Sequence, residues 1–167
     1  MKYSLNNFKR FARSYYLLLK HSVIFEENVR LLNPNIRVGK NVKFYSGVHI
    51  LGGGKIKIGN NVAIGKDTII YSNKEIVIGE NTLIAGQCYI IDSDHGIEKC
   101  KLIKNQTLIS EKIYIGSDVW IGAGVKVLKG VNINSGSVIG AMSLVNKDTT
   151  ENSINVGIPI REINMRN

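Results

Sequence analysis

The sequence predicts an all-β fold, a parallel β-solenoid, and three observations on one stretch support this prediction. Residues Ile115 to Thr150 repeat every six positions without interruption, reading IGSDVW, IGAGVK, VLKGVN, INSGSV, IGAMSL and VNKDTT. Position one is always Ile or Val, and position five is small or β-branched. Position four mostly holds residues that tolerate a left-handed backbone, namely Asp118, Gly124, Gly130, Gly136 and Asp148. A period of six fits neither a helix nor an alternating strand, but it is typical of a β-solenoid.

The length of the repeat also predicts the shape of the coils. Three hexads make one three-sided coil of 18 residues, and successive coils are expected to hydrogen-bond about 4.7–4.9 Å apart, as neighbouring strands do. Residues 18 positions apart then stack on one face, as Ala123 does with Ala141.

Residues 1–35 precede the regular hexads and are predicted to form a helical cap. Apolar residues recur there at helical spacings among basic ones: Phe8, Phe11, Tyr15, Leu18 and Leu19. The terminal coil of a solenoid needs a cover for its open end. The alternative is a basic amphipathic helix that makes a peripheral contact with a membrane surface.

Residues 36–167 are predicted to form the solenoid domain, of about five coils. Ile36, Ile56 and Ile76 lie 20 residues apart, so each of the first two coils carries a short insertion. A much longer insertion, loop 91–112, falls in the same hexad of the third coil. All the insertions therefore leave one edge of the prism, which indicates a binding face there. In the tail, residues 151–167, Pro159 cannot continue a ladder, so the chain is expected to leave the solenoid.

The composition argues against several classes of protein. The net charge is +9, but the basic residues are spread out, with no Arg-rich run among aromatics, so nucleic-acid binding is not expected. Cys88 and Cys100 form no disulfide framework and no metal-type spacing. No apolar run reaches the roughly 18 residues of a membrane span, and no secretory signal is visible. We therefore expect a cytoplasmic protein without a metal.

The long loop opens with DSDHG at residues 92–96 and holds the candidate catalytic base. His95 alone among the three histidines lies in this loop beside acidic residues; His21 is in the N-terminal segment and His49 on an early strand. Imidazole is suited to proton transfer at physiological pH. The alternative for His95 is a solvated histidine without a chemical role.

Residues 117–148, SDVWIGAGVKVLKGVNINSGSVIGAMSLVNKD, closely resemble the hexads of the left-handed β-helix acyltransferases. This hexapeptide-repeat family includes galactoside, maltose, serine and xenobiotic acetyltransferases. The resemblance implies a left-handed coil, and it identifies DSDHG with the active-site segment of sugar O-acetyltransferases, with His95 as general base. Asp92 or Asp94 would orient its ring, and the sequence leaves the choice between them open.

The same resemblance implies that acetyl-CoA binds along the prism edge, between two subunits of a homotrimer. The residues that match the family's cofactor site are Trp120, Ala123, Ala141, Asn146, Lys147 and Arg161. The two alanines would lend backbone groups to the pantetheine arm, and the two cations would bind phosphate. Asp67 and Asn73 fall near positions that bind the acceptor sugar in related enzymes. Met142 departs from the family pattern, where this corner residue is small.

The expected function is acetyl transfer from acetyl-CoA to a hydroxyl of a sugar or polysaccharide precursor. A drug-modifying enzyme and an amino-sugar N-acetyltransferase use the same hexads and remain alternatives. A serine acetyltransferase would carry a large helical N-terminal domain, which this sequence lacks. A γ-type carbonic anhydrase would need three clustered histidines, and a solenoid scaffold would have no catalytic role.

Overall fold

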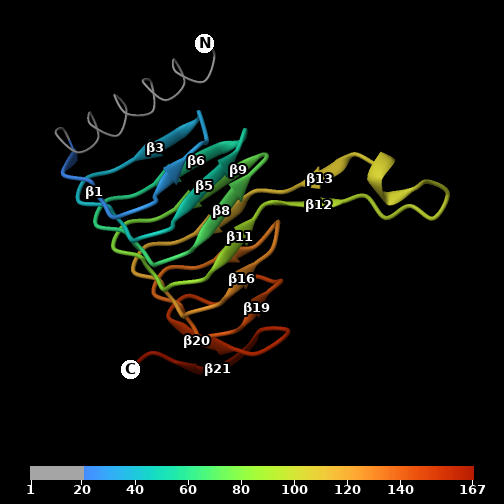
Figure 1. Cartoon of the computed structure of the whole chain (residues 1–167). Helices are drawn as coiled ribbons and strands as arrows, with labels where there is room; N and C mark the ends of the chain where they lie inside the picture. The colour runs from blue at the N-terminus through green and yellow to red at the C-terminus, as the bar shows by residue number, and fades with distance from the viewer. Residues whose placement is uncertain (1–20) are drawn as a thin grey trace, which may run out of the picture.

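The computed structural model describes residues 21–167, which form a three-sided β-solenoid (Figure 1). The first sheet contains β1 (Ile24–Phe25), β4 (Lys43–Phe44), β7 (Ala63–Ile64), β10 (Leu83–Ile84), β15 (Trp120–Ile121), β18 (Val138–Ile139), β20 (Ser153–Val156) and β21 (Arg161–Met165). The second contains β2 (Arg30–Leu31), β5 (His49–Gly52), β8 (Ile69–Ser72), β11 (Tyr89–Ile91), β16 (Lys126–Val127) and β19 (Leu144–Val145). The third contains β3 (Ile36–Val38), β6 (Lys55–Ile58), β9 (Glu75–Ile78), β14 (Ile113–Ile115) and β17 (Asn132–Ile133).

The solenoid has about seven turns, so the prediction of about five coils was too low. Residues 24–38 form a complete first coil instead of part of a cap, since β1 and β2 pair in parallel with β4 and β5. At the other end, β20 adds a further parallel strand to β18. Residues 1–20, which hold the spacings that predicted a helix, lie outside the described residues. Among the residues that are described, no helix has the length and apolar character needed to cross a membrane.

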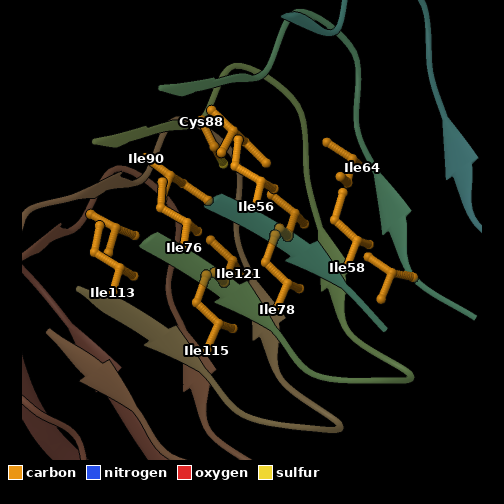
Figure 2. Packing of buried hydrophobic residues seen from close by; sticks show 14 of the residues in the cluster. Ile56, Ile58, Ile64, Ile76, Ile78, Cys88, Ile90, Ile113, Ile115 and Ile121 are labelled. Carbon is orange, nitrogen blue, oxygen red and sulfur yellow. The ribbon is translucent and has the colours of Figure 1, made fainter. Parts of the chain in front are cut away.

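The core is a stack of mostly aliphatic side chains from positions one and five of the hexads (Figure 2). Ile76, Ile113, Ile115 and Ile121 are fully buried, and each lies directly above or below an equivalent residue of the next coil. Burying one such side chain contributes about 1.5–3 kcal/mol. Each hexad therefore buries two side chains, an aliphatic one at position one and a smaller or β-branched one at position five, such as Val119 and Val125.

The corners have the backbone conformation that the repeat predicted. Asp118, Gly124 and Gly130 have φ angles of 54°, 72° and 78°, in the left-handed region. Met142 has the same conformation, with φ of 59°, so a residue with a side chain does not change the shape of that corner. Asp148 does not share it; its carboxylate instead accepts hydrogen bonds from the backbone and side-chain nitrogens of Asn132, at 2.7 and 3.0 Å.

The tail does not leave the solenoid, contrary to the expectation for Pro159. The chain reverses after β20, and β21 returns along it as an antiparallel strand. Ile160 is buried, and its backbone N–H donates to the Leu144 carbonyl at 2.9 Å. Proline ends the parallel ladder because it lacks the N–H group, and the returning strand then covers the exposed edge of β20.

Candidate active site

The long loop forms an arm that projects from one edge of the prism (Figure 1). Its two strands, β12 (Ser93–His95) and β13 (Leu108–Ser110), pair antiparallel, and a short 3-10 helix, η1 (Ile103–Asn105), lies beyond them. The arm leaves between β11 and β14, at the edge between the second and third sheets. His95 ends β12 opposite Leu108 and is exposed. A strand pair therefore holds the candidate base away from the core.

Asp92 braces the root of the arm. Its side chain is fully buried, and its carboxylate accepts hydrogen bonds from the Ser72 hydroxyl at 2.8 Å and from the backbone N–H groups of Asn73 and Lys74 at 2.7 and 2.8 Å. The side-chain amide of Asn73 also donates to the Ser93 hydroxyl at 2.7 Å. The short insertion of the preceding coil thus serves as the support on which the arm rests.

Asp94 lies on the solvent side of the arm and makes different contacts. Lys129 Nζ lies 3.7 Å from its carboxylate and 2.7 Å from that of Glu111. Hydrogen bonding to Glu111, with a smaller contribution from Asp94, raises the pKa of Lys129. Because successive side chains of a strand point to opposite faces, Asp94 and His95 point apart.

Within residues 21–167, neither aspartate makes a hydrogen bond or ion pair with His95. The structure thus accounts for Asp92 as a brace and for Asp94 as a partner of Lys129. The sequence did not single out Ser72, Lys74 or Lys129. The signal for Ser72 was its separation of 20 residues from Asp92, one coil of the same length as the earlier ones.

The predicted cofactor residues lie along two edges of the prism. Ala123 and Ala141 are exposed and stack at the edge between the first and second sheets, where the Met142 N–H donates to the Ala123 carbonyl at 2.8 Å. Arg161 begins β21 opposite Val156, at this same edge. Trp120 lies on the first sheet between Leu83 and Val138 and is 56% exposed.

Asn146 and Lys147 follow β19 and lie at the edge from which the arm leaves. The second sheet separates them from Ala141 and Arg161 in a single chain. Lys147 and Arg161 are exposed and form no ion pair with any described residue. Both cations are therefore available to an anionic ligand.

The two predicted acceptor residues are also at different edges. Asn73 lies at the root of the arm through its contacts with Asp92 and Ser93. Asp67 lies between β7 and β8, at the edge opposite the arm across the second sheet, in a left-handed corner with φ of 57°. Among residues 21–167, no three His, Cys, Asp or Glu side chains come together as a possible metal site.

Comparisons with known proteins bear on the fold and on the hexapeptide repeat. Residues 112–147 match the family model described as bacterial transferase hexapeptide (six repeats). A galactoside acetyltransferase structure in complex with coenzyme A is 30% identical, with 93% of this chain and 70% of that chain covered and a TM-score of 0.59.

A maltose O-acetyltransferase from Clostridium difficile is 27% identical over 93% of this chain and 75% of its own, with a TM-score of 0.58. A variant of AntD, an N-acyltransferase from Bacillus cereus, in complex with dTDP and coenzyme A, gives a TM-score of 0.78 at 23% identity, covering 87% of this chain and 82% of its own. At that identity AntD supports the fold alone. The comparison with curated protein sequences gave no significant match.

Proposed function

The chain belongs to the bacterial hexapeptide-repeat transferase family, and we propose that it transfers an acetyl group from acetyl-CoA to a hydroxyl of a sugar or polysaccharide precursor. The galactoside acetyltransferase that covers 93% of this chain binds coenzyme A, which supports the donor. The maltose enzyme transfers to oxygen, which favours a hydroxyl acceptor over an amine.

The observation that carries the proposal is His95, exposed at the end of β12 on an arm that Asp92 braces. The imidazole takes the proton of the acceptor hydroxyl while the hydroxyl oxygen attacks the thioester carbonyl. The new C–O bond forms, the C–S bond breaks, and the proton passes to the sulfur of the leaving thiol. Acetyl ester and free coenzyme A are the products.

The cofactor site takes residues from both edges of the prism. The backbone groups of Ala123 and Ala141 contact the pantetheine arm, and the Trp120 ring forms an aromatic wall. Arg161 lies at the same edge as the two alanines. Lys147 lies across the second sheet. In the proposed homotrimer, a cofactor between two copies contacts Arg161 of one copy and Lys147 of the next, so both cations bind its phosphates.

The proposed homotrimer also provides cover for exposed apolar side chains. On the arm, Ile97 is 82% exposed and Ile109 48%, and on the first sheet Leu83 is 54% exposed beside Trp120. Light scattering should give three copies per particle. A monomer with full activity would contradict this assembly.

The proposed reaction is tested by thiol release from acetyl-CoA with a panel of acceptors: sugars, amino sugars, serine and drug hydroxyls. The expected result is turnover with sugar hydroxyls that His95→Ala lowers by about 10²–10⁴-fold, while the matched control His49→Ala, on β5, retains activity. Turnover with amino sugars alone would show that the acceptor group is an amine and would reject the hydroxyl acceptor. A protein that neither releases thiol nor binds acetyl-CoA would be a scaffold, and the proposal would fail.

A further inference from the structure

A basic groove lies on the same edge as the arm, in the first coils, and the proposed reaction does not yet use it. The cavity has a volume of about 660 Å³ and is open to solvent. Its lining includes glycine backbone at residues 53–54 and six polar or basic side chains from three successive coils: Asn35, Arg37, Lys55, Lys57, Asn73 and Lys74. No acidic side chain lines it.

Carboxylates near this groove offset only part of its positive charge. Lys57 is paired with Glu75 at 2.9 Å, and Lys112 shares the same carboxylate at 3.4 Å, so the hydrogen bond from Lys57 lowers the pKa of Glu75. Arg37, Lys55 and Lys74, in contrast, form no ion pair with any described residue. Lys55 nevertheless lies opposite Glu75 in the register of β6 and β9. Hydrogen bonding to Lys129 lowers the pKa of Glu111, and the charge of Lys74 contributes to this shift. The groove therefore carries an excess of positive charge that neighbouring carboxylates offset only in part.

The strand register brings two of the cations together. Arg37 on β3 lies directly opposite Lys57 on the neighbouring parallel strand β6, and such strands are about 4.8 Å apart. Like charges directly opposite each other destabilise a sheet. Glu75 already offsets the charge of Lys57, so Arg37 is the cation of this pair that is left for an anionic ligand.

The groove is joined to the arm that carries His95. Asn73 and Lys74 line the groove and also donate their backbone N–H groups to Asp92. One coil separates this insertion from the arm, and three extended residues lead from Asp92 to His95, at most about 10 Å. The insertion that lines the groove is therefore in direct contact with the start of the arm.

We propose that this groove binds the phosphate or diphosphate of the acceptor, so the acceptor is a phosphate-linked sugar and its hydroxyl reaches His95 from the anion site. This inference rests on the proposed acyl transfer. The same phosphate chemistry belongs to a nucleoside diphosphate and to a polyprenyl diphosphate lipid, and the two are separated by experiment.

Inorganic pyrophosphate is the first probe, titrated by calorimetry into the whole protein with saturating coenzyme A present, so that the cofactor's own phosphate site is filled. Lys55→Gln and Lys74→Gln should each weaken pyrophosphate binding by about tenfold, and binding should weaken as salt rises. The matched control is Lys40→Gln, an exposed lysine that does not line the groove and should bind like wild type. Equal binding by all four proteins would overturn the anion site.

The second experiment identifies the source of the phosphate. Uridine diphosphate in solution and phosphatidylcholine vesicles containing polyprenyl diphosphate are compared for binding to wild type and to Lys74→Gln. Binding of either probe that depends on Lys74 supports the site and names the source. Absence of such dependence for both probes overturns the inference.

Thiol release then separates this inference from the proposed function. Pyrophosphate binding that depends on Lys55, in a protein without thiol release for any acceptor, would leave the anion site standing and reject the acyl transfer. Thiol release with unphosphorylated sugars at the same kcat/KM as with their phosphorylated forms, unchanged in Lys55→Gln, would keep the acyl transfer and reject the phosphate-linked acceptor.

Discussion

Replacing Asp92 by Asn should loosen the arm that presents His95 while leaving the solenoid folded. The substitution keeps the size of the side chain and removes its charge. In the native structure the two carboxylate oxygens accept three hydrogen bonds, from the Ser72 hydroxyl and the backbone N–H groups of Asn73 and Lys74. An amide retains one oxygen, and its NH2 group must face at least one of these donors.

The magnitude follows from the count of lost hydrogen bonds. One oxygen accepts from Asn73 and the other from both Ser72 and Lys74, so the better orientation of the amide still loses one bond. Losing a hydrogen bond to a charged, buried group costs about 1.5–3 kcal/mol. For a domain of this length, that lowers Tm by about 3–12 °C.

Thermal unfolding and steady-state kinetics check this prediction together. Asp92→Asn should unfold at lower temperature and show a lower kcat, with an unchanged KM for acetyl-CoA. The matched control is Asp94→Asn, whose side chain is 50% exposed and should change stability by about 0.5 kcal/mol or less. Wild-type Tm for Asp92→Asn, or an equal loss in both variants, would refute the role of Asp92 as the brace.

Three further outcomes are expected. His95→Ala should lower kcat by about 10²–10⁴-fold, the range for loss of a general base, without changing Tm, since the side chain is exposed; retained turnover would reject the mechanism. Lys147→Gln and Arg161→Gln should each raise the KM for acetyl-CoA by about tenfold, because each removes a charge-assisted phosphate contact, while the KM for the acceptor stays constant. An unchanged KM for acetyl-CoA in the double variant would reject the cofactor site. Burial raises the pKa of the Cys88 thiol, whereas Cys100 is exposed. A thiol reagent should therefore label Cys100 alone in the native protein at neutral pH and both cysteines in denaturant. Rapid labelling of Cys88 in the native protein would contradict its buried position.

The hexads by themselves determined the solenoid. An aliphatic residue at every sixth position, as at Ile115 and Ile121, can be buried repeatedly only if the chain turns a corner in each hexad. The residue types indicate the left-handed corners at Asp118 and Gly124, because few other residues adopt that conformation at little cost. Asp148 and Met142 show that residue type does not decide every corner.

The first coil was present in the sequence but harder to recognise. Phe25 and Leu31 occupy position one, six residues apart, and Asn28 provides a left-handed corner with φ of 58°. Position one holds Phe and Leu there instead of Ile or Val. The helical spacings that precede these residues led to their inclusion in the predicted cap. The packing of Phe25 on Phe44, with ring centroids 5.4 Å apart, identifies these residues as part of the solenoid.

The sequence also located the edge from which the arm leaves, but only the tertiary structure decided which side chains meet there. The contact between Ser72 and Asp92 depends on how a short insertion bulges from one coil onto the next. The pairing of Arg37 with Lys57 depends on the register of two strands 20 residues apart. A repeat specifies which residues face inward, because burial acts on every coil in the same way. The 20-residue spacing indicates which residues of successive coils stack, such as Ser72 with Asp92, but it does not give the hydrogen bonds between the two insertions, which form once in the molecule.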